Sequence, residues 1–319
     1  MGICCTVIYA MGIVLLYKIV WKLYILLRNN FLLKELNLLQ RYSSSSGSAP
    51  WVLITGATDG IGWGFAQHFA KRGFNIVLIG RSKEKTDGRA QELKTQSPKV
   101  SVRTVLRDFT NCGSVDFFKG IVDELKGLDI GLLVNNVGIA EGALIGFEDE
   151  KVFNTVLVNC MPQAMMLQTW LKVLEGRKGC RSAVIDVSSL SSVKESGAFP
   201  IYSASKVFNK YLTLGTDYTQ QFKNVDFLCL TPGWVMTNLI SGKLPENPLA
   251  ATVDECVGGA LKCLGQTNQC YGAVRSMIHG MIIETLNFML PTRYVMMCLF
   301  LFNKILFKFS AKPAQKKDQ

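Results

Sequence analysis

The sequence predicts an α/β fold in which helices cover both faces of a doubly wound parallel sheet, with an N-terminal membrane helix and an apolar C-terminal arm. Three observations predict this fold. Short apolar runs alternate with helical patterns from residue 51 to about residue 276, a glycine-rich turn follows the first run, and apolar segments flank this region within the 319 residues. Such alternation is typical of a parallel sheet between two helical layers.

Residues 1–42 are predicted to be a membrane anchor with a basic juxtamembrane segment. The run Ile3–Leu27 is almost continuously apolar and long enough for a helix that crosses a bilayer. No charge precedes it, whereas Lys18 and Lys22 interrupt it towards its end. This asymmetry favours an uncleaved anchor with the following domain in the cytosol, and an amphipathic helix on the membrane surface is the alternative. The start also fits a myristoylation pattern at Gly2.

Residues 43–50 form a Ser/Gly linker, and the folded domain is predicted to span residues 51–276. Its strands are predicted at the apolar runs Val52–Thr55, Asn75–Ile79, Val102–Leu106, Gly131–Asn135, Ala183–Val187 and Val225–Leu230. Residues 277–319 become apolar and aromatic again before a basic tail, and charges and a proline break them into pieces too short to span a bilayer cleanly. We expect a membrane-associated arm there. The alternative is an arm that packs over the substrate pocket or a dimer partner, so a homodimer stays open.

The net charge of +11 lies mostly at the two ends. Residues 1–41 carry +4 and residues 293–319 carry +5, which leaves +2 for the middle. Basic residues beside apolar segments favour anionic lipid headgroups as partners, not nucleic acid. Among ten cysteines, Cys256, Cys263 and Cys270 recur every seventh residue, which predicts one face of a helix. Without a Cys-x-x-Cys pair and with two histidines, we expect buried reduced thiols and no metal site.

A glycine-rich turn follows the first predicted strand, in the segment Thr55-Gly56-Ala57-Thr58-Asp59-Gly60-Ile61-Gly62. Glycines let the backbone turn tightly and approach a pyrophosphate, and the helix that begins near Ile61 offers its N-terminal amides to the phosphates. The context between a strand and a helix predicts a dinucleotide site, with an ordinary turn as the alternative. The predicted contacts are Gly56, Thr58, Asp59, Gly60, Ile61 and Gly62.

The ends of the next strands indicate which dinucleotide binds. Arg81 follows the second strand, where an acidic residue would grip the ribose of NAD and a basic one accommodates the 2′-phosphate of NADP. The sequence therefore predicts NADP(H). Asp108, past the third strand, is placed to accept a hydrogen bond from the adenine amine, and Asn135 and Gly138 close the fourth strand beside the cofactor.

Ser189, Tyr202 and Lys206 form the candidate catalytic group, with Asn159 as a fourth member. Tyr202 and Lys206 are four residues apart and share one face of a helix. An adjacent ammonium lowers the pKa of a tyrosine towards the working range of an acid–base catalyst. Ser189 ends the fifth strand, and Asn159 is the candidate for holding a water that links Lys206 to solvent.

With these residues in order, the chain resembles the short-chain dehydrogenase/reductase family over roughly residues 50–275. It looks most like the membrane-bound branch that contains very-long-chain 3-oxoacyl-CoA reductase and the 17β-hydroxysteroid dehydrogenases of types 3 and 12. The resemblance implies a Rossmann sheet of about seven strands and hydride transfer from NADPH to a carbonyl carbon. It also implies that Ser189 binds the carbonyl oxygen, Tyr202 donates a proton, and Lys206 holds the nicotinamide ribose. The further implied contacts, with the carboxamide end of the cofactor, are Pro232, Val235 and Thr237.

The resemblance makes the reduction of a 3-oxoacyl-CoA in fatty-acid elongation the first reading of function. A 17β-hydroxysteroid dehydrogenase is the second, and a catalytically silent NADP-binding membrane scaffold is an alternative of another class. Residues 234–251 resemble an apolar substrate lid, in which Lys243 is a candidate contact for CoA phosphates. The last four residues, 316–319, resemble a dilysine retrieval signal, which implies the endoplasmic-reticulum membrane with the catalytic domain facing the cytosol.

Overall fold

The computed structural model describes residues 2–44, 47–140, 148–193, 199–237, 250–291, 293–294 and 297. The chain divides into two compact units, residues 1–34 and 35–319. The first unit consists of α1 (Gly2–Leu27) and a π-helical extension, η1 (Arg28–Leu32). Within the described part of the chain, Cys5–Leu32 is the one helical stretch whose length and mean hydropathy of 1.8 allow it to cross a membrane. The predicted lid residues 238–249 and basic tail lie outside the described residues.

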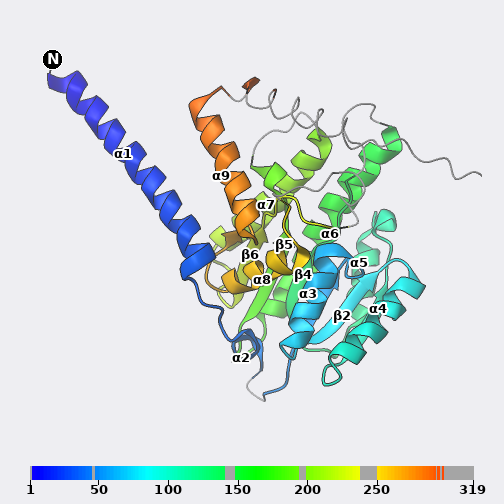
Figure 1. The fold of residues 1–319 in the computed structure, drawn as a ribbon. Helices are drawn as coiled ribbons and strands as arrows, with labels where there is room; N and C mark the ends of the chain where they lie inside the picture. Colours follow the sequence, from blue (N-terminus) through cyan, green and yellow to red (C-terminus); the bar gives the residue numbers. More distant parts are fainter. Residues whose placement is uncertain are drawn as a thin grey trace, which may run out of the picture. The chain divides into compact units, whose positions relative to one another are not determined.

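The second unit is built on a sheet of seven parallel strands in the order β3-β2-β1-β4-β5-β6-β7 (Figure 1). The strands are β1 (Trp51–Thr55), β2 (Asn75–Gly80), β3 (Val102–Leu106), β4 (Ile130–Asn135), β5 (Ser182–Val187), β6 (Val225–Leu230) and β7 (Gln269–Cys270). The doubly wound fold is thereby confirmed, and six strands lie within one residue of their predicted bounds. The two-residue β7 is too short to leave an apolar run in the sequence.

Helices connect consecutive strands and cover both faces of the sheet. They are α3 (Gly60–Lys71), α4 (Lys83–Gln96), α5 (Val115–Glu124), α6 (Asp149–Glu175), α7 (Pro200–Tyr218) and α8 (Val253–Cys263), and α9 (Val274–Met289) follows the last strand. Helix α3 contacts α4 and α8, whereas α6 contacts α5 and α7. Every residue of β4 and β5 is buried, as expected for central strands covered on both faces.

Side-chain caps start several helices just after the strands and so fix the carboxyl edge of the sheet. Asp59 caps α3 by accepting a 2.8 Å hydrogen bond from the Gly60 amide. Ser82 caps α4 in the same way, and Thr252 and Glu255 form a capping box at α8. Capping residues satisfy amides that have no partner within the helix. These caps begin α3 and α4 within a few residues of the ends of β1 and β2. The N-terminal amides of both helices therefore lie at this edge of the sheet.

The α/β unit begins before the predicted boundary at Trp51. Helix α2 (Leu38–Tyr42) packs on the body of the unit and buries Leu38 and Tyr42 almost completely. Arg41 donates two hydrogen bonds to Asp226, and the Tyr42 hydroxyl donates a third at 2.9 Å. Residues 35–42 thus belong structurally to the second unit and not to the first. The partner of Arg41 lies 185 residues away, which local sequence patterns do not reveal.

The predicted helical register of three cysteines is wrong for one of them. Cys256 and Cys263 lie on α8, but Cys270 lies on β7, because the helix ends at Cys263 and Gly265 turns the chain with a φ of +75°. All three thiols are buried, as expected. Burial raises the pKa of Cys256 to about 12, so this thiol is protonated at neutral pH.

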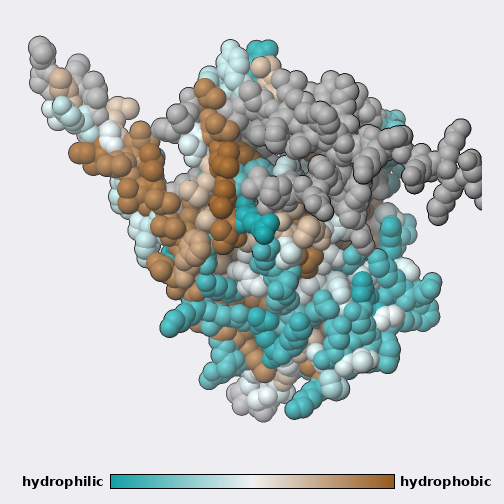
Figure 2. All heavy atoms as spheres, in the orientation of Figure 1, coloured by the Kyte–Doolittle hydropathy of each residue, from teal (hydrophilic) through white to brown (hydrophobic). Residues whose placement is uncertain are grey.

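Helix α9 begins the C-terminal arm and shows an exposed apolar stripe at four-residue spacing. Figure 2 shows this stripe as a brown band along the helix. Its members are Val274, Ile278, Ile282, Leu286 and Leu290. The opposite face of α9 packs on the domain, where Ser276 is fully buried and His279 contacts the Trp234 ring at 4.9 Å between ring centroids. The helix is therefore amphipathic, with one face packed on the protein and an apolar face exposed among the described residues.

Candidate active site

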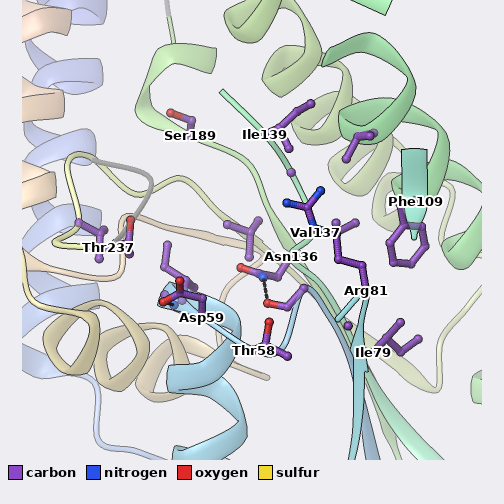
Figure 3. A pocket seen from close by; sticks show the side chains of 18 of the residues that line it. Thr58, Asp59, Ile79, Arg81, Phe109, Asn136, Val137, Ile139, Ser189 and Thr237 are labelled. Carbon is purple, nitrogen blue, oxygen red and sulfur yellow. Dashed lines mark hydrogen bonds between the residues drawn. The ribbon is translucent and has the colours of Figure 1, made fainter. Parts of the chain in front are cut away.

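A cavity of about 580 Å³ opens at the carboxyl edge of the sheet, between the loop after β1 and the loops after β4, β5 and β6. In Figure 3, Ser189 and Thr237 lie at one side of this cavity, and Ile79 and Phe109 lie at the other. Ligands of doubly wound folds bind at this edge, where the strand order reverses. Most predicted site residues line it, namely Gly56, Thr58, Asp59, Gly60, Ile61, Arg81, Asp108, Gly138, Ser189, Tyr202, Lys206, Pro232, Val235 and Thr237.

The glycine-rich loop needs its glycines for two different reasons. Gly56 and Gly60 adopt φ values of +62° and +52°, a region that L side chains rarely enter. Gly62 is required by packing, because a Cβ there would collide with the Gly56 carbonyl oxygen and the Asn136 amide. Gly62 does not line the cavity. The absence of a Cβ at Gly62 lets α3 approach the loop, and its predicted contact with the cofactor stays a prediction.

Asn136 lines the cavity although the sequence pattern did not indicate it, whereas its neighbour Asn135, predicted to contact the cofactor, does not line it. The Asn136 side chain donates to the carbonyl oxygens of Thr55 and Gly56, at 3.0 and 3.1 Å, and ties the end of β4 to the glycine loop. Asn135 points away from the cavity and exchanges hydrogen bonds with the backbone and side chain of Gln163. Alternation along β4 explains the difference, since adjacent residues face opposite sides.

One end of the cavity is basic. Arg81, Lys85 and Arg107 line it, together with the Ser82 hydroxyl that caps α4. Lys85 is already paired with Asp59 at 3.2 Å, and Arg107 with Glu124 at 3.0 Å. Arg81 is exposed at the cavity wall, directly after β2. This end has the charge and the hydrogen-bond donors to bind a phosphate group.

Asp108 lies near the basic end, where the sequence placed it. It caps a short 3-10 helix, η2 (Phe109–Asn111), by accepting hydrogen bonds at Oδ1 from the amide and hydroxyl of Thr110. These bonds hold the carboxylate on the cavity wall, beside the Phe109 ring that also lines it. An aromatic ring next to a carboxylate suits a flat heterocycle with an amine, such as adenine.

Ser189, Tyr202 and Lys206 meet at the opposite end of the cavity. Ser189 follows β5 and caps η3 (Leu190–Ser192), where it accepts from the Ser191 amide and hydroxyl. Tyr202 and Lys206 lie one turn apart on α7, with Lys206 Nζ 5.7 Å from the centroid of the tyrosine ring. Lys206 Nζ donates a 3.0 Å hydrogen bond to the Val187 carbonyl oxygen.

Burial dominates the electrostatics of this end. It raises the pKa of Tyr202, and the Ser189 hydroxyl acts in the opposite direction. It lowers the pKa of Lys206 to about 8. Lys206 Nζ bonds the Val187 carbonyl and lies 5.7 Å from the centre of the tyrosine ring, so the lowering of the Tyr202 pKa by its ammonium stays a prediction.

Asn159 lies behind the cavity wall rather than on it. Its side chain donates to the Ile139 carbonyl and the Ser205 hydroxyl, each at 3.0 Å, and accepts from the Ile139 amide. A Cβ on Gly138 would lie 3.2 Å from both Asn159 Oδ1 and Lys206 Nζ. Gly138 therefore leaves room for the amide and the ammonium to approach each other, as the candidate tetrad requires.

Comparison with known proteins agrees with this geometry. A family model described as short chain dehydrogenase matches residues 50–247, more than half of the chain. The chain belongs to the short-chain dehydrogenase family. It is 32% identical over 286 residues to the very-long-chain 3-oxoacyl-CoA reductase of Anas platyrhynchos, covering 87% of this chain and 88% of that protein. It is 29% identical to the 17-beta-hydroxysteroid dehydrogenase type 3 of Danio rerio, covering 74% and 76%.

The fold is shared with solved members of the family. A short-chain dehydrogenase from Sphingobium yanoikuyae, solved in complex with NADPH, superposes with a TM-score of 0.58 at 26% identity. The match covers 67% of this chain and 84% of that one. The chain is accordingly an oxidoreductase of this family, and these two relatives are named for an acyl-CoA and a steroid substrate.

Proposed function

We propose that this short-chain dehydrogenase uses NADPH to reduce a lipid carbonyl, with 3-oxoacyl-CoA reduction in fatty-acid elongation as the leading assignment. The observation that carries the proposal is one cavity with Arg81 at its basic end and Ser189, Tyr202 and Lys206 at the other. The two ends match the two halves of the cofactor. The intact catalytic group argues against a silent scaffold, since loss of the tyrosine would be the expected mark of one.

The residues of the cavity fit NADP(H). The α3 N-terminus and the left-handed glycines Gly56 and Gly60 offer backbone amides for a pyrophosphate. Arg81, with Ser82 and Lys85 beside it, supplies a cation and donors where a 2′-phosphate would lie. The NADPH complex of the Sphingobium relative supports the same choice. When bound, NADPH supplies the hydride that the protein side chains cannot supply.

The side chains at the other end have complementary roles. Ser189 donates a hydrogen bond to the substrate carbonyl oxygen and fixes its position next to Tyr202. Tyr202 gives its phenolic proton to that oxygen as negative charge develops, which is general acid catalysis. Lys206 lies over the tyrosine ring and, when protonated, stabilises the phenolate that remains. Asn159 holds the Ile139 backbone at the wall near Lys206.

A membrane-bound lipid is the substrate class that the rest of the chain favours. Helix α1 is apolar enough to anchor the chain, and the exposed stripe of α9 suits contact with acyl chains. The reductase relative matches 87% of this chain, which supports the acyl-CoA over the steroid. We propose an endoplasmic-reticulum location with the catalytic unit in the cytosol, on the charge asymmetry around α1 and the dilysine-like end.

The test compares the two substrates directly. Membranes that contain the full chain would be given NADPH with either a long-chain 3-oxoacyl-CoA or a 17-ketosteroid, and NADPH consumption would be followed. The proposal predicts much faster turnover of the acyl-CoA. Preference for the steroid would replace the assignment by a 17β-hydroxysteroid dehydrogenase. Replacing NADPH by NADH in the same assay would test the cofactor, with slower turnover expected.

A further inference from the structure

A fully buried group of polar side chains lies on the protein side of Lys206, away from the cavity. These side chains come from four elements that meet there: β4, β5, α6 and α7. Each is at most 1% exposed, and the members are Asn135, Gln163, Asp186, Asn209 and Thr213. Asn135 and Asp186 are direct neighbours in the parallel register of β4 and β5, so their side chains project to the same face. We refer to these five residues as the polar cluster.

Several polar atoms of the cluster have no hydrogen-bond partner among the described residues. Asp186 Oδ2 accepts from the Thr213 hydroxyl at 2.6 Å, but Oδ1 has none. The same holds for both amide atoms of Asn209 and for the side-chain oxygens of Asn135 and Gln163. Unpaired buried polar groups are costly, and proteins bridge them with internal water. The cluster therefore has the composition of an internal water site.

This site continues directly to the catalytic lysine. Lys206, Asn209 and Thr213 follow one another at spacings of three and four residues on α7, so they share one face. Thr213 contacts Asp186 on β5, which sets that face against the strand. Lys206 Nζ bonds the carbonyl of Val187, the residue next to Asp186. Asn209 lies between Lys206 and Thr213 along α7.

A buried ammonium requires a negative charge nearby to remain protonated. Lys206 is only 4% exposed. Three groups act on it to favour the charged form: Cys160 on α6, Cys229 on β6 and Asp186 on β5. Burial raises the pKa of both thiols, that of Cys229 to about 12, so they are neutral at pH 7. Asp186 is thus the group of these three that can carry a negative charge at pH 7.

We propose that Asp186 is a positioning residue that keeps Lys206 protonated, acting through Asn209 and the internal water held by the polar cluster. The proposal rests on the function proposed above, because the protonated lysine is what supports Tyr202. It assigns Asp186 no contact with substrate or cofactor. The Thr213 hydroxyl holds the carboxylate in place for this role.

The pKa values of Asp186 and Lys206 define the pH range in which both groups are charged. Burial raises the pKa of Asp186 from 3.8 to about 6, against the effects of Thr213, Asn135 and Lys206. Burial lowers the pKa of Lys206 to about 8. Both groups are charged between these values. Removing the charge of Asp186 lowers the Lys206 pKa further. Lys206 should then lose its proton at a lower pH, and the rate of reduction should fall there too.

The first test is the pH profile of kcat/KM for NADPH-dependent reduction by the full chain in membranes. Asp186→Asn keeps the size of the side chain and an oxygen for Thr213. It should move the alkaline limb about one pH unit towards acid, with activity below pH 7 within about twofold of the wild type. Thr213→Val should move it in the same direction by less. Thr216→Val is the matched control, because its hydroxyl bonds only the Leu212 carbonyl among the described residues, and its profile should not move.

A second readout needs no turnover. The melting temperatures of the wild type and Asp186→Asn, as full chains in detergent, would be compared from pH 4 to pH 8. Because the folded pKa of Asp186 is raised, the wild type should lose stability relative to the variant as pH rises towards about 6. An alkaline limb that stays in place in Asp186→Asn overturns the proposal, and so does a stability difference that begins to change only above pH 7, because Asp186 would then be uncharged at the working pH. If the wild type reduced no ketone, the proposed function would fail, while the melting curves would still decide whether Asp186 titrates in the fold.

Discussion

Two glycine-to-alanine substitutions of the same chemistry should have opposite effects on stability. In Gly62→Ala, the new methyl group would collide with the Gly56 carbonyl oxygen and with Asn136, which holds the glycine loop. Both are backbone or hydrogen-bonded atoms that cannot yield without moving α3 or the end of β4. Overpacking of this kind costs about 1–3 kcal/mol. Gly88→Ala adds the same methyl in α4, where nothing lies within 4 Å, and should gain about 0.5–1 kcal/mol.

Thermal unfolding and NADPH fluorescence measure the two consequences of these substitutions. For a domain of this size, 1 kcal/mol corresponds to about 2–4 °C in Tm, so the two variants should move in opposite directions from the wild type. Gly62→Ala should also weaken NADPH binding, because the loop and the α3 amides no longer align, whereas Gly88→Ala should not. Equal stability and equal NADPH affinity for Gly62→Ala and the wild type would refute the packing argument for the loop.

Asp226→Ala should destabilise the catalytic unit by about 1–2 kcal/mol, because it leaves Arg41 and Arg181 without their shared carboxylate in a partly exposed site. The pKa of Asp226 is lowered below 3.8, so its stabilisation should be present above that pH and be lost as the pH falls further. An Asp226→Ala variant that unfolds with the same pH dependence as the wild type would contradict this prediction. Arg81→Asp should raise the KM for NADPH at least about tenfold, through the loss of a charge-assisted hydrogen bond and new repulsion, and should lower the preference for NADPH over NADH. Lys85→Ala should have a smaller effect on that KM, because Lys85 is already paired with Asp59.

Local patterns were sufficient for most of the fold and for the core of the site. Central parallel strands are covered on both faces and are therefore mostly apolar, so β1, β2, β4, β5 and β6 are visible as runs. The approach of Ser189 to Tyr202 and Lys206 follows from the parallel order of strands and the four-residue helical spacing. Both relations are fixed by regular backbone geometry, which explains why they could be predicted.

Features that depend on tertiary packing were missed or misassigned. The docking of α2 relies on Asp226, a residue far along the chain, and so the domain boundary was placed too late. Asn136, not Asn135, reaches the glycine loop, and only the strand's alternation decides between them. The effect of Lys206 on the Tyr202 pKa depends on where its ammonium lies. The ammonium bonds the Val187 carbonyl oxygen, and residue spacing does not define that position.

The measurement that tests the central claim most directly is a comparison of Tyr202→Phe with the wild type, in both NADPH turnover and NADPH affinity. Phenylalanine keeps the ring over which Lys206 lies and removes only the proton donor. The account predicts a loss of at least about 100-fold in kcat on the preferred lipid ketone, with the Kd for NADPH within about twofold of the wild type. Full turnover by Tyr202→Phe would contradict the assignment of Tyr202 as the acid and, with it, the reduction mechanism.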